Sequence, residues 1–187
     1  MPLNMNPEEY EIVKRCQAGD RSAFRPLVVR YQRMVFSQCL KMLGDEEEAK
    51  DIMQDTFVKA WQTIGRYDSR HAFSTWLYTI ATRRCMDRLK QLRRLVPLPE
   101  DVEQLQLFLS EDTAHRQLEN KELASIVRTL TAELGDKQRV VFTLCQLEGL
   151  ESDEIEEITG MDAQQVKSNL YAARQNIKKR LKKLGYE

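Results

Sequence analysis

Hydrophobic residues recur at three- and four-residue steps along most of this chain, and this spacing predicts a helical protein. Glycine stands directly after several of the periodic segments, where a helix commonly ends. No stretch alternates between apolar and polar residues over the length of a strand, so we expect an all-α fold. The predicted helices cover residues 7–18, 22–43, 46–64, 73–94, 116–134, 136–148, 152–158 and 163–184.

Two prolines divide the helical pattern into two parts. Pro97 and Pro99 follow the fourth predicted helix, and the acidic stretch after them shows no clear periodicity. We therefore predict two small helical domains, residues 1–95 and 116–187, joined by a linker over residues 96–115. The linker is too apolar for a fully solvated tether, and we expect it to dock on another surface through Leu105, Leu107, Phe108 and Leu109.

The C-terminal part of the chain has the pattern of a helix-turn-helix motif. A short amphipathic helix is followed by a turn that contains Gly160, and the next helix opens at Ala163. An apolar stripe on this second helix predicts its buried face, formed by Val166, Leu170, Ala173, Ile177, Leu181 and Leu184. The opposite face is either an ordinary solvated surface or a DNA-binding surface, whose contacts would be Gln164, Gln165, Lys167, Ser168, Tyr171, Arg174 and Lys178.

The third predicted helix carries a polar patch away from its apolar stripe. The patch consists of Asp51, Gln54 and Asp55, and it is typical either of a protein-binding surface or of a simply solvated helix face. Two carboxylates one turn apart could also serve a metal-dependent nuclease, but no histidine or third carboxylate is placed to complete such a site. We therefore predict no metal, cofactor or catalytic residue in this chain.

The next loop and helix combine hydrogen-bonding groups with positive charge. The second half of the helix is strongly basic, with Arg83, Arg84 and Arg88 as candidate phosphate contacts. The loop before it mixes an aromatic ring with polar side chains, a composition shared by ordinary surface loops and by loops that hold an unstacked base. Its candidate contacts are Arg66, Tyr67, Asp68, Ser69, Arg70 and His71.

The formal net charge of zero hides this clustering. The chain has 29 basic and 29 acidic residues, but the basic ones concentrate in residues 76–94 and 163–187. Most acids lie elsewhere, which indicates two anion-binding surfaces and at least one surface for a further partner.

The cysteines and the hydropathy of the chain indicate in which cellular compartment the protein acts. The four cysteines lie in helical patterns among apolar neighbours, so we expect reduced, buried thiols. No apolar run approaches the ~20 residues of a membrane span. The first residues lack the pattern of a signal peptide, and we expect a cytoplasmic protein.

Four runs of residues together resemble the extracytoplasmic-function sigma factors in order and spacing. They are GDRSAFRPLVVRYQ, GDEEEAKDIMQDTFVKAWQTI, RHAFSTWLYTIATRRCMDRLK and GLESDEIEEITGMDAQQVKSNLYAARQNIKKRLKK. The most specific pieces are D-x-x-Q-D-x-F at residues 51–57 and F-S-T-W-L-Y at residues 73–78. The likeness covers nearly the whole chain apart from the linker.

The resemblance implies a role for each candidate surface. Asp51, Gln54 and Asp55 would dock on the clamp helices of core RNA polymerase. The loop of residues 66–71 would capture a flipped base of the promoter −10 element, beside duplex held by Arg83, Arg84 and Arg88. The helix from Ala163 would read the −35 element. The resemblance further implies an anti-sigma factor as regulator.

The chain departs from the family pattern at three places. Many members have Asn where Arg83 stands, which leaves the base preference upstream in the −10 element open. Many have G-T-V-K-S-R where residues 164–169 read QQVKSN, which leaves −35 contacts near Asn169 open. The adjacent acids Glu156 and Glu157 make the first helix of the motif unusually negative.

Other classes of protein share parts of this pattern. A dimeric helix-turn-helix regulator would explain the C-terminal domain, but it gives no role to the acidic third helix or the basic fourth helix. A nuclease using Asp51 and Asp55, or an adaptor without DNA contact, explains less of the sequence.

Overall fold

The computed structural model describes residues 7–95 and 115–185, and every regular element in these ranges is helical. The first domain contains α1 (Pro7–Gln17), η1 (Arg21–Ala23), α2 (Phe24–Leu43), α3 (Glu46–Thr63), η2 (Ile64–Arg66) and α4 (Phe73–Leu95). The second contains α5 (His115–Thr131), α6 (Asp136–Phe142), the π-helical turn η4 (Thr143–Leu147), α7 (Ser152–Thr159) and α8 (Ala163–Lys183).

The predicted all-α fold of two helical domains is confirmed. The predicted linker over residues 96–115 lies outside the described residues except for its last residue, and so do the four apolar residues expected to dock it. No helix in the described part of the chain is both long and apolar enough to cross a membrane. Of the four predicted free thiols, Cys16, Cys39 and Cys85 are buried, whereas Cys145 is partly exposed.

A tight turn folds α2 back against α3. Gly44 ends α2 with a φ of 68°, a left-handed conformation that glycine adopts without the steric cost of a Cβ. The next residue, Asp45, caps α3, because its carboxylate accepts a hydrogen bond from the Glu48 amide at 3.0 Å. Glu46, Glu47 and Glu48 then place negative charge in the first turn of α3, where the helix dipole favours it.

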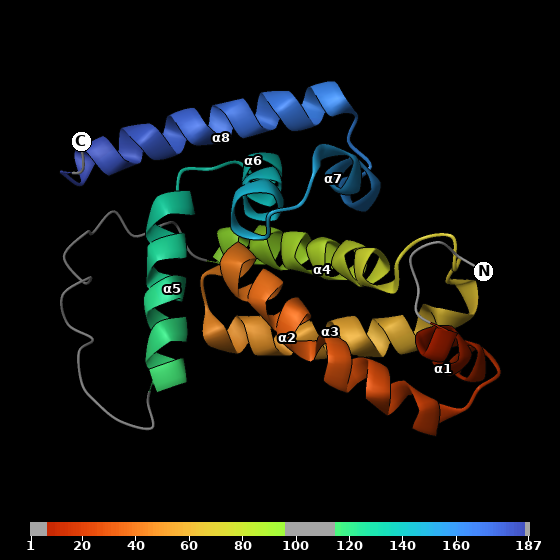
Figure 1. The fold of residues 1–187 in the computed structure, drawn as a ribbon. Coiled ribbons are helices and arrows are strands. Elements are labelled where there is room, and N and C mark those ends of the chain that lie inside the picture. The colour runs from red at the N-terminus through yellow and green to blue at the C-terminus, as the bar shows by residue number, and fades with distance from the viewer. Residues whose placement is uncertain (1–6, 96–114, 186–187) are drawn as a thin grey trace.

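Helix α4 crosses the α2–α3 pair and completes the first domain (Figure 1). Phe73 and Leu77 of α4 and Leu27 and Leu40 of α2 are fully buried between these helices. A polar contact sets the position of α4 within this core, because the buried Gln38 side chain donates to Thr82 Oγ1 at 2.7 Å.

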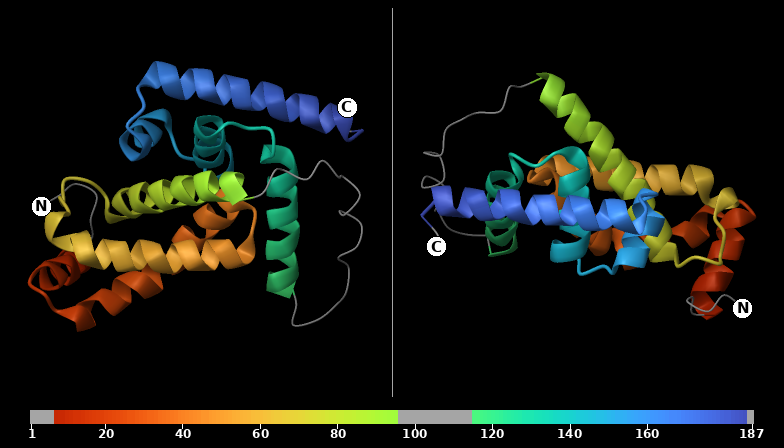
Figure 2. Two further views of the ribbon diagram at one scale, coloured as in Figure 1. Left: turned by 180° about the vertical axis from the view of Figure 1, so that it is seen from behind. Right: turned by 90° about the horizontal axis from the view of Figure 1, so that it is seen from above.

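The second domain packs directly on the first. Helix α5 stands across the α2–α3 turn, while α6, η4 and α7 lie over α4 and α2, with α8 outermost (Figure 1, Figure 2). A single apolar cluster runs through both domains, so the two share one core in this arrangement. The second domain contributes Ala124, Val140, Val141, Leu144, Ile155, Ile158, Met161 and Val166 to it.

Two helix ends differ from the sequence prediction for physical reasons. The predicted helix over residues 136–148 stops being α-helical at Phe142, and a wider turn closes with the Glu148 amide donating to the Thr143 carbonyl at 2.9 Å. The helix predicted to reach Leu134 ends at Thr131, whose carbonyl accepts a hydrogen bond from the buried Arg139 guanidinium at 2.7 Å.

Gly44 also sets how closely α5 approaches the first domain. A Cβ built at this position would lie 3.1 Å from the Ala124 carbonyl oxygen and from Arg128 Cβ. At Gly19, which also has a positive φ, a Cβ would meet nothing within 4 Å. Gly19 therefore offers a matched control for the left-handed backbone alone.

We expect Gly44→Ala to lower the free energy of unfolding by about 2–4 kcal/mol, since it combines backbone strain with overpacking against α5. Gly19→Ala should lower it by only about 1–2 kcal/mol, from the backbone alone. Urea denaturation followed by circular dichroism measures both changes. Equal losses at the two positions would contradict the close packing of α5 on Gly44.

Candidate nucleic-acid and polymerase interfaces

The predicted polymerase-docking face, Asp51, Gln54 and Asp55, lies fully on the surface of α3. The apolar stripe of the same helix, which includes Ile52 and Phe57, is buried against α2 and α4. Because these polar residues sit on the opposite side from that stripe, the face is available to a partner. This placement fits both interpretations of the sequence, a protein-binding surface and a simply solvated helix face.

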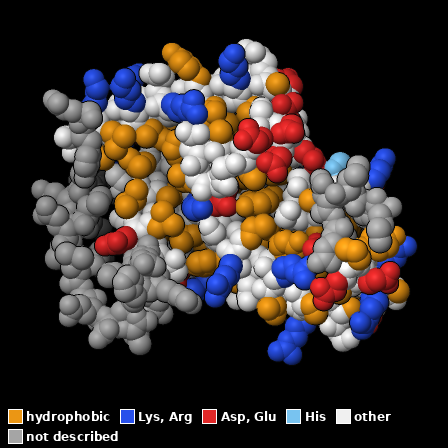
Figure 3. All heavy atoms as spheres, in the orientation of Figure 1, with side chains coloured by type: hydrophobic (Ala, Val, Ile, Leu, Met, Phe, Trp, Pro, Cys, Tyr) orange, Lys and Arg blue, Asp and Glu red, His pale blue; other side chains and the backbone are white. Residues whose placement is uncertain are grey.

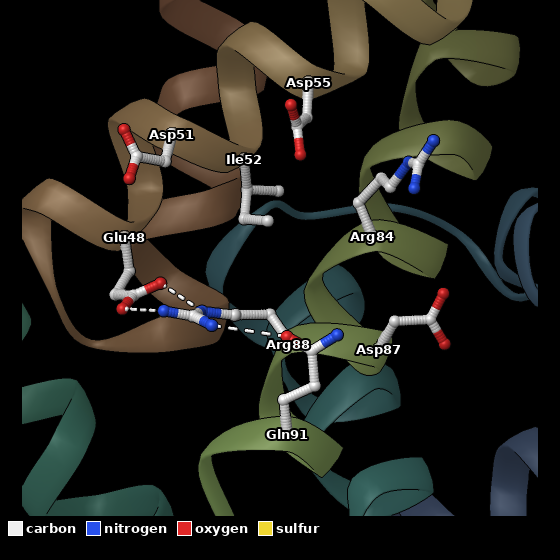
Figure 4. A pocket seen from close by; sticks show the side chains of 8 residues that line it. All are labelled: Glu48, Asp51, Ile52, Asp55, Arg84, Asp87, Arg88 and Gln91. Atoms are coloured by element: carbon white, nitrogen blue, oxygen red, sulfur yellow. Dashed lines mark hydrogen bonds and ion pairs between the residues drawn. The ribbon is translucent and has the colours of Figure 1, made fainter.

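A shallow hollow of about 290 Å³ lies between this face and α4. Its α3 wall carries carboxylates, and its α4 wall carries both charges (Figure 4). The residues around it are Glu48, Asp51, Ile52, Asp55, Arg84, Asp87, Arg88 and Gln91. The mixed charge suits a polar protein partner, and no group of three or more His, Cys, Asp or Glu in the described ranges is placed to hold a metal ion.

Arg88 differs from the other two predicted phosphate contacts of α4. Its guanidinium forms a double hydrogen bond with the Glu48 carboxylate of α3, with Nη2 donating to Oε1 at 2.6 Å (Figure 4). This pairing raises the pKa of the arginine further. Arg83 is fully exposed and Arg84 half-buried. The structure thus places Arg88 in a helix–helix ion pair, where DNA would have to compete with Glu48.

The predicted base-capturing loop, residues 66–71, has a buried centre and an exposed rim. Tyr67 is only 5% exposed, because its ring packs against Phe73 and Trp76. Its hydroxyl donates to the His71 carbonyl at 2.6 Å and so closes the loop. Tyr67 therefore supports the loop and does not offer its ring to a base in this conformation.

The rim of the loop is polar and charged. Arg66, Asp68, Arg70 and His71 are exposed, and Ser69 is partly so. The Arg70 guanidinium and amide both donate to the Asp68 carboxylate, which holds the pKa of that carboxyl at about 2. Asp68 thus stays ionised and fixes the shape of the loop through Arg70.

Gln17, at the end of α1, is a loop contact that the sequence pattern did not suggest. Its side-chain amide donates to the carbonyls of Ile64 at 3.2 Å and Tyr67 at 3.0 Å. Both acceptors lie at the base of the loop, so α1 helps to position it. A lone glutamine near a helix end carries no distinctive sequence signal, and only the fold reveals this role.

The helix-turn-helix motif is built as predicted. Gly160 ends α7 in a left-handed conformation, and Asp162 caps α8 by accepting from the Gln165 amide at 2.8 Å. Val166, Ala173 and Ile177 of the predicted stripe are buried. The outward side chains are exposed, as predicted, at Gln164, Gln165, Lys167, Ser168, Tyr171, Arg174 and Lys178.

Two of these outward side chains also have local hydrogen bonds. The Gln165 side-chain oxygen accepts from the Asp162 amide at 3.2 Å, which completes a capping box. Ser168 Oγ donates to the Gln165 carbonyl at 3.1 Å. By contrast, Tyr171 presents 67% of its surface to solvent, so its ring is open to a partner.

Polar contacts between the domains bring α7 and η4 onto the first domain. His71 of the loop lies 2.5 Å from a carboxylate oxygen of Glu157 on α7. Glu148, just after η4, is buried against α2 and α4, where Lys41 Nζ lies 2.8 Å from one carboxylate oxygen and the Tyr78 hydroxyl donates to the other at 2.8 Å. Neither contact is predictable from local sequence, because 86 and 107 residues separate His71 from Glu157 and Lys41 from Glu148.

Comparison with known proteins matches both halves of the chain to one family. The family model of sigma-70 region 2 matches residues 27–95, and that of sigma-70 region 4 matches residues 124–177. The chain is 31% identical to the ECF RNA polymerase sigma factor SigW of Bacillus subtilis, covering 92% of this chain and 96% of that one. It is 29% identical to the RNA polymerase sigma-H factor of Pseudomonas aeruginosa, covering 95% of each.

Solved structures share the fold over most of the chain. CnrH, in complex with the cytosolic domain of CnrY, has a TM-score of 0.65 at 24% identity, with 94% of this chain and 97% of that one covered. The sigma factor RpoE of Bartonella quintana, in complex with the anti-sigma factor NepR, has a TM-score of 0.62 at 19% identity, with 85% and 96% covered. With two sigma-70 regions in order and relatives matched over nearly their whole length, this chain belongs to the ECF RNA polymerase sigma factors.

Proposed function

We propose that this sigma factor acts in the cytoplasm and directs core RNA polymerase to promoters through three separate surfaces. The polymerase-docking face binds the core enzyme, the loop of residues 66–71 captures an unpaired −10 base, and the outward face of α8 reads the −35 element. The observation that carries the proposal is the two-sided character of α8, the capped second helix of the helix-turn-helix. Its apolar stripe is buried, while its polar and basic side chains face solvent.

The loop supports strand capture through its shape. Tyr67 and Gln17 hold it from the inside, Asp68 fixes Arg70 on its rim, and the other exposed polar side chains of the rim remain to contact a base. Arg83 and Arg84 on the next helix place positive charge nearby for the backbone. Holding an unstacked base offsets the few kcal/mol that unpairing costs, while the polymerase carries out nucleotide transfer.

Regulation by a partner protein follows from the family. CnrH and RpoE of Bartonella quintana are each solved in complex with another protein, which for RpoE is an anti-sigma factor. We extend this to the present chain and propose an anti-sigma factor as its partner, alongside core polymerase and promoter DNA.

Run-off transcription on genomic promoters tests the docking face. With core polymerase from a related bacterium, we expect discrete transcripts that depend on this protein. The triple variant Asp51→Ala, Gln54→Ala, Asp55→Ala should reduce them at least tenfold, because interface residues at the centre of a docking patch typically contribute more than 1.4 kcal/mol together. The exposed Glu122 of α5 serves as control, and Glu122→Ala should leave transcription unchanged.

The same experiment distinguishes the sigma factor from the main alternative, a regulator that binds DNA by itself. A dimeric helix-turn-helix regulator would give no protein-dependent transcripts and no core binding, yet would bind a palindromic duplex tightly by itself. That pattern of results would replace the sigma-factor mechanism proposed for these surfaces.

The outward face of α8 leads to a second prediction, which concerns how its side chains divide between phosphate and base contacts. In the reconstituted holoenzyme, Lys167→Ala should weaken promoter binding about equally across −35 sequences. It should also lower the slope of log K against log salt concentration by about one, since one phosphate contact is lost. Gln164→Ala should instead cost about 1–3 kcal/mol on the preferred sequence and relax the preference at one base pair. Filter binding at several salt concentrations on −35 variants measures both. Identical behaviour of the two variants would contradict the division into phosphate and base contacts.

A further inference from the structure

The loop of residues 66–71 begins in a turn whose backbone is held from α1. Helical turn η2 leads out of α3 and ends at Arg66. The Gln17 side-chain amide of α1 donates to the Ile64 carbonyl at 3.2 Å and to the Tyr67 carbonyl at 3.0 Å. One side chain therefore holds the carbonyl groups on both sides of Arg66, although it lies 47 and 50 residues away from them along the chain.

Helix α1 is itself firmly attached to the first domain. Val13 and Cys16 are buried in the core. The buried Glu9 carboxylate accepts hydrogen bonds from the Arg30 guanidinium at 2.9 Å and from the Tyr31 hydroxyl at 2.8 Å, both on α2. Because a buried carboxylate that loses its donors is costly, these bonds oppose any movement of α1. Gln17 thus acts from a fixed helix.

Aromatic rings fix the inner side of the same loop. The Tyr31 ring lies 5.5 Å from the Phe73 ring, which lies 5.2 Å from the Tyr67 ring, measured between centroids. The attachment of α1 and the interior of the loop therefore share one aromatic cluster. The rings hold the side chain of Tyr67, and Gln17 holds the backbone of the turn that carries Arg66.

Arg66 differs from the other basic side chains of the loop in having no protein partner. The Arg70 guanidinium donates to the Asp68 carboxylate at 2.7 Å, and His71 lies 2.5 Å from a Glu157 carboxylate oxygen. Arg66 is exposed, and within the described part of the chain its side chain has no ion pair or hydrogen bond. A guanidinium in this state is available to a phosphate, which it can bind through two parallel hydrogen bonds.

We propose that Arg66 holds a backbone phosphate of the captured −10 strand and that Gln17 is the positioning residue that keeps Arg66 in place. The inference rests on the function proposed above. Single strands are held by positive groups along the backbone together with contacts to the bases. Arg83 and Arg84 supply such charge on α4, whereas Arg66 supplies it on the loop itself. A turn that is already ordered loses less freedom on binding, so the contact from Gln17 raises the affinity.

Strand binding by the reconstituted holoenzyme tests the phosphate contact. The probe is a fluorescein-labelled non-template −10 strand from a promoter that run-off transcription identifies, and fluorescence anisotropy gives its affinity at several salt concentrations. Arg66→Ala should weaken binding about fivefold and reduce the slope of log K against log salt concentration by about 0.7, the value for one phosphate contact on a single strand. The loss should be the same for every base at the captured position, because a phosphate carries no sequence information. Arg33→Ala, at an exposed position of α2 outside the proposed surfaces, should bind like the wild type.

A double-mutant cycle tests the positioning role. Gln17→Met keeps the length of the side chain but removes its donor, and it should weaken binding about threefold, within the range of a single hydrogen bond. In the Arg66→Ala background the same substitution should cause no further loss, because Gln17 acts through Arg66. Gln62→Met is the matched control, since Gln62 is an exposed glutamine of α3 without a hydrogen bond among the described residues.

Stiffening the turn should compensate for the lost hydrogen bonds. Gly65 does not have a positive φ, and a Cβ built there would meet nothing within 4 Å, so the site accepts alanine. Gly65→Ala should therefore restore most of the affinity that Gln17→Met loses. Circular dichroism on heating identifies any variant that unfolds, and Arg66→Ala, at an exposed position, decides the question if Gln17→Met does so.

Three results would contradict the proposal. Unchanged affinity in Arg66→Ala, or a loss confined to one base, excludes the phosphate contact. Equal losses from Gln17→Met in the presence and absence of Arg66 exclude the positioning role. A wild-type holoenzyme that does not bind the strand would overturn the function proposed above together with this inference, whereas normal binding by every variant would remove the inference alone.

Discussion

The arrangement of the whole molecule depends on one buried carboxylate. The Glu148 side chain is 8% exposed, and its two oxygens meet Lys41 and Tyr78 from two different helices of the other domain. Burial, together with the nearby carboxylate, raises the pKa of the Tyr78 hydroxyl, so this group stays a donor. A small shift of the second domain would leave a buried charge without partners, which is costly. The contact therefore selects one packing of the domains.

The same contact does not make that packing permanent. Taking two charges out of water costs about as much as their attraction returns, so a buried ion pair adds little net stability. If the domains were separated, Lys41 and Glu148 would recover their hydration, and the remaining cost would be the exposure of shared apolar residues such as Leu144 and Ile158. An interface with a polar centre is thus specific when closed and still able to open. By contrast, Gln38 and Thr82 tie α2 to α4 inside a domain that stays intact.

Local periodicity and capping explain what the sequence could predict. The buried stripe of α3, the glycine at the end of α7 and the Asp162 cap of α8 are each determined within a few residues, and the structure has them as expected. The docking face and the outward face of α8 follow from the same periodicity, because a helix that buries one side exposes the other.

Long-range contacts explain what could not be predicted. Tyr67 has the composition of a base-stacking residue, but its burial depends on Phe73 and Trp76 folding over it. Arg88 has the charge of a phosphate contact, but Glu48 lies within reach only because α3 and α4 cross there. An arginine that binds DNA and one that binds a carboxylate are identical in sequence. The packing of the two domains is likewise invisible to local pattern.

The neutral total charge of the chain hides basic faces whose binding to nucleic acid must be kept in check. Separate basic faces on α4 and α8 would bind nucleic acid non-specifically in proportion to the phosphates they neutralise. Glu157 of α7 reaches the loop beside α4 and offsets positive charge there at short range, where screening is weak. Two individually weak DNA contacts then act together only on polymerase, where the tether gives each a high effective concentration.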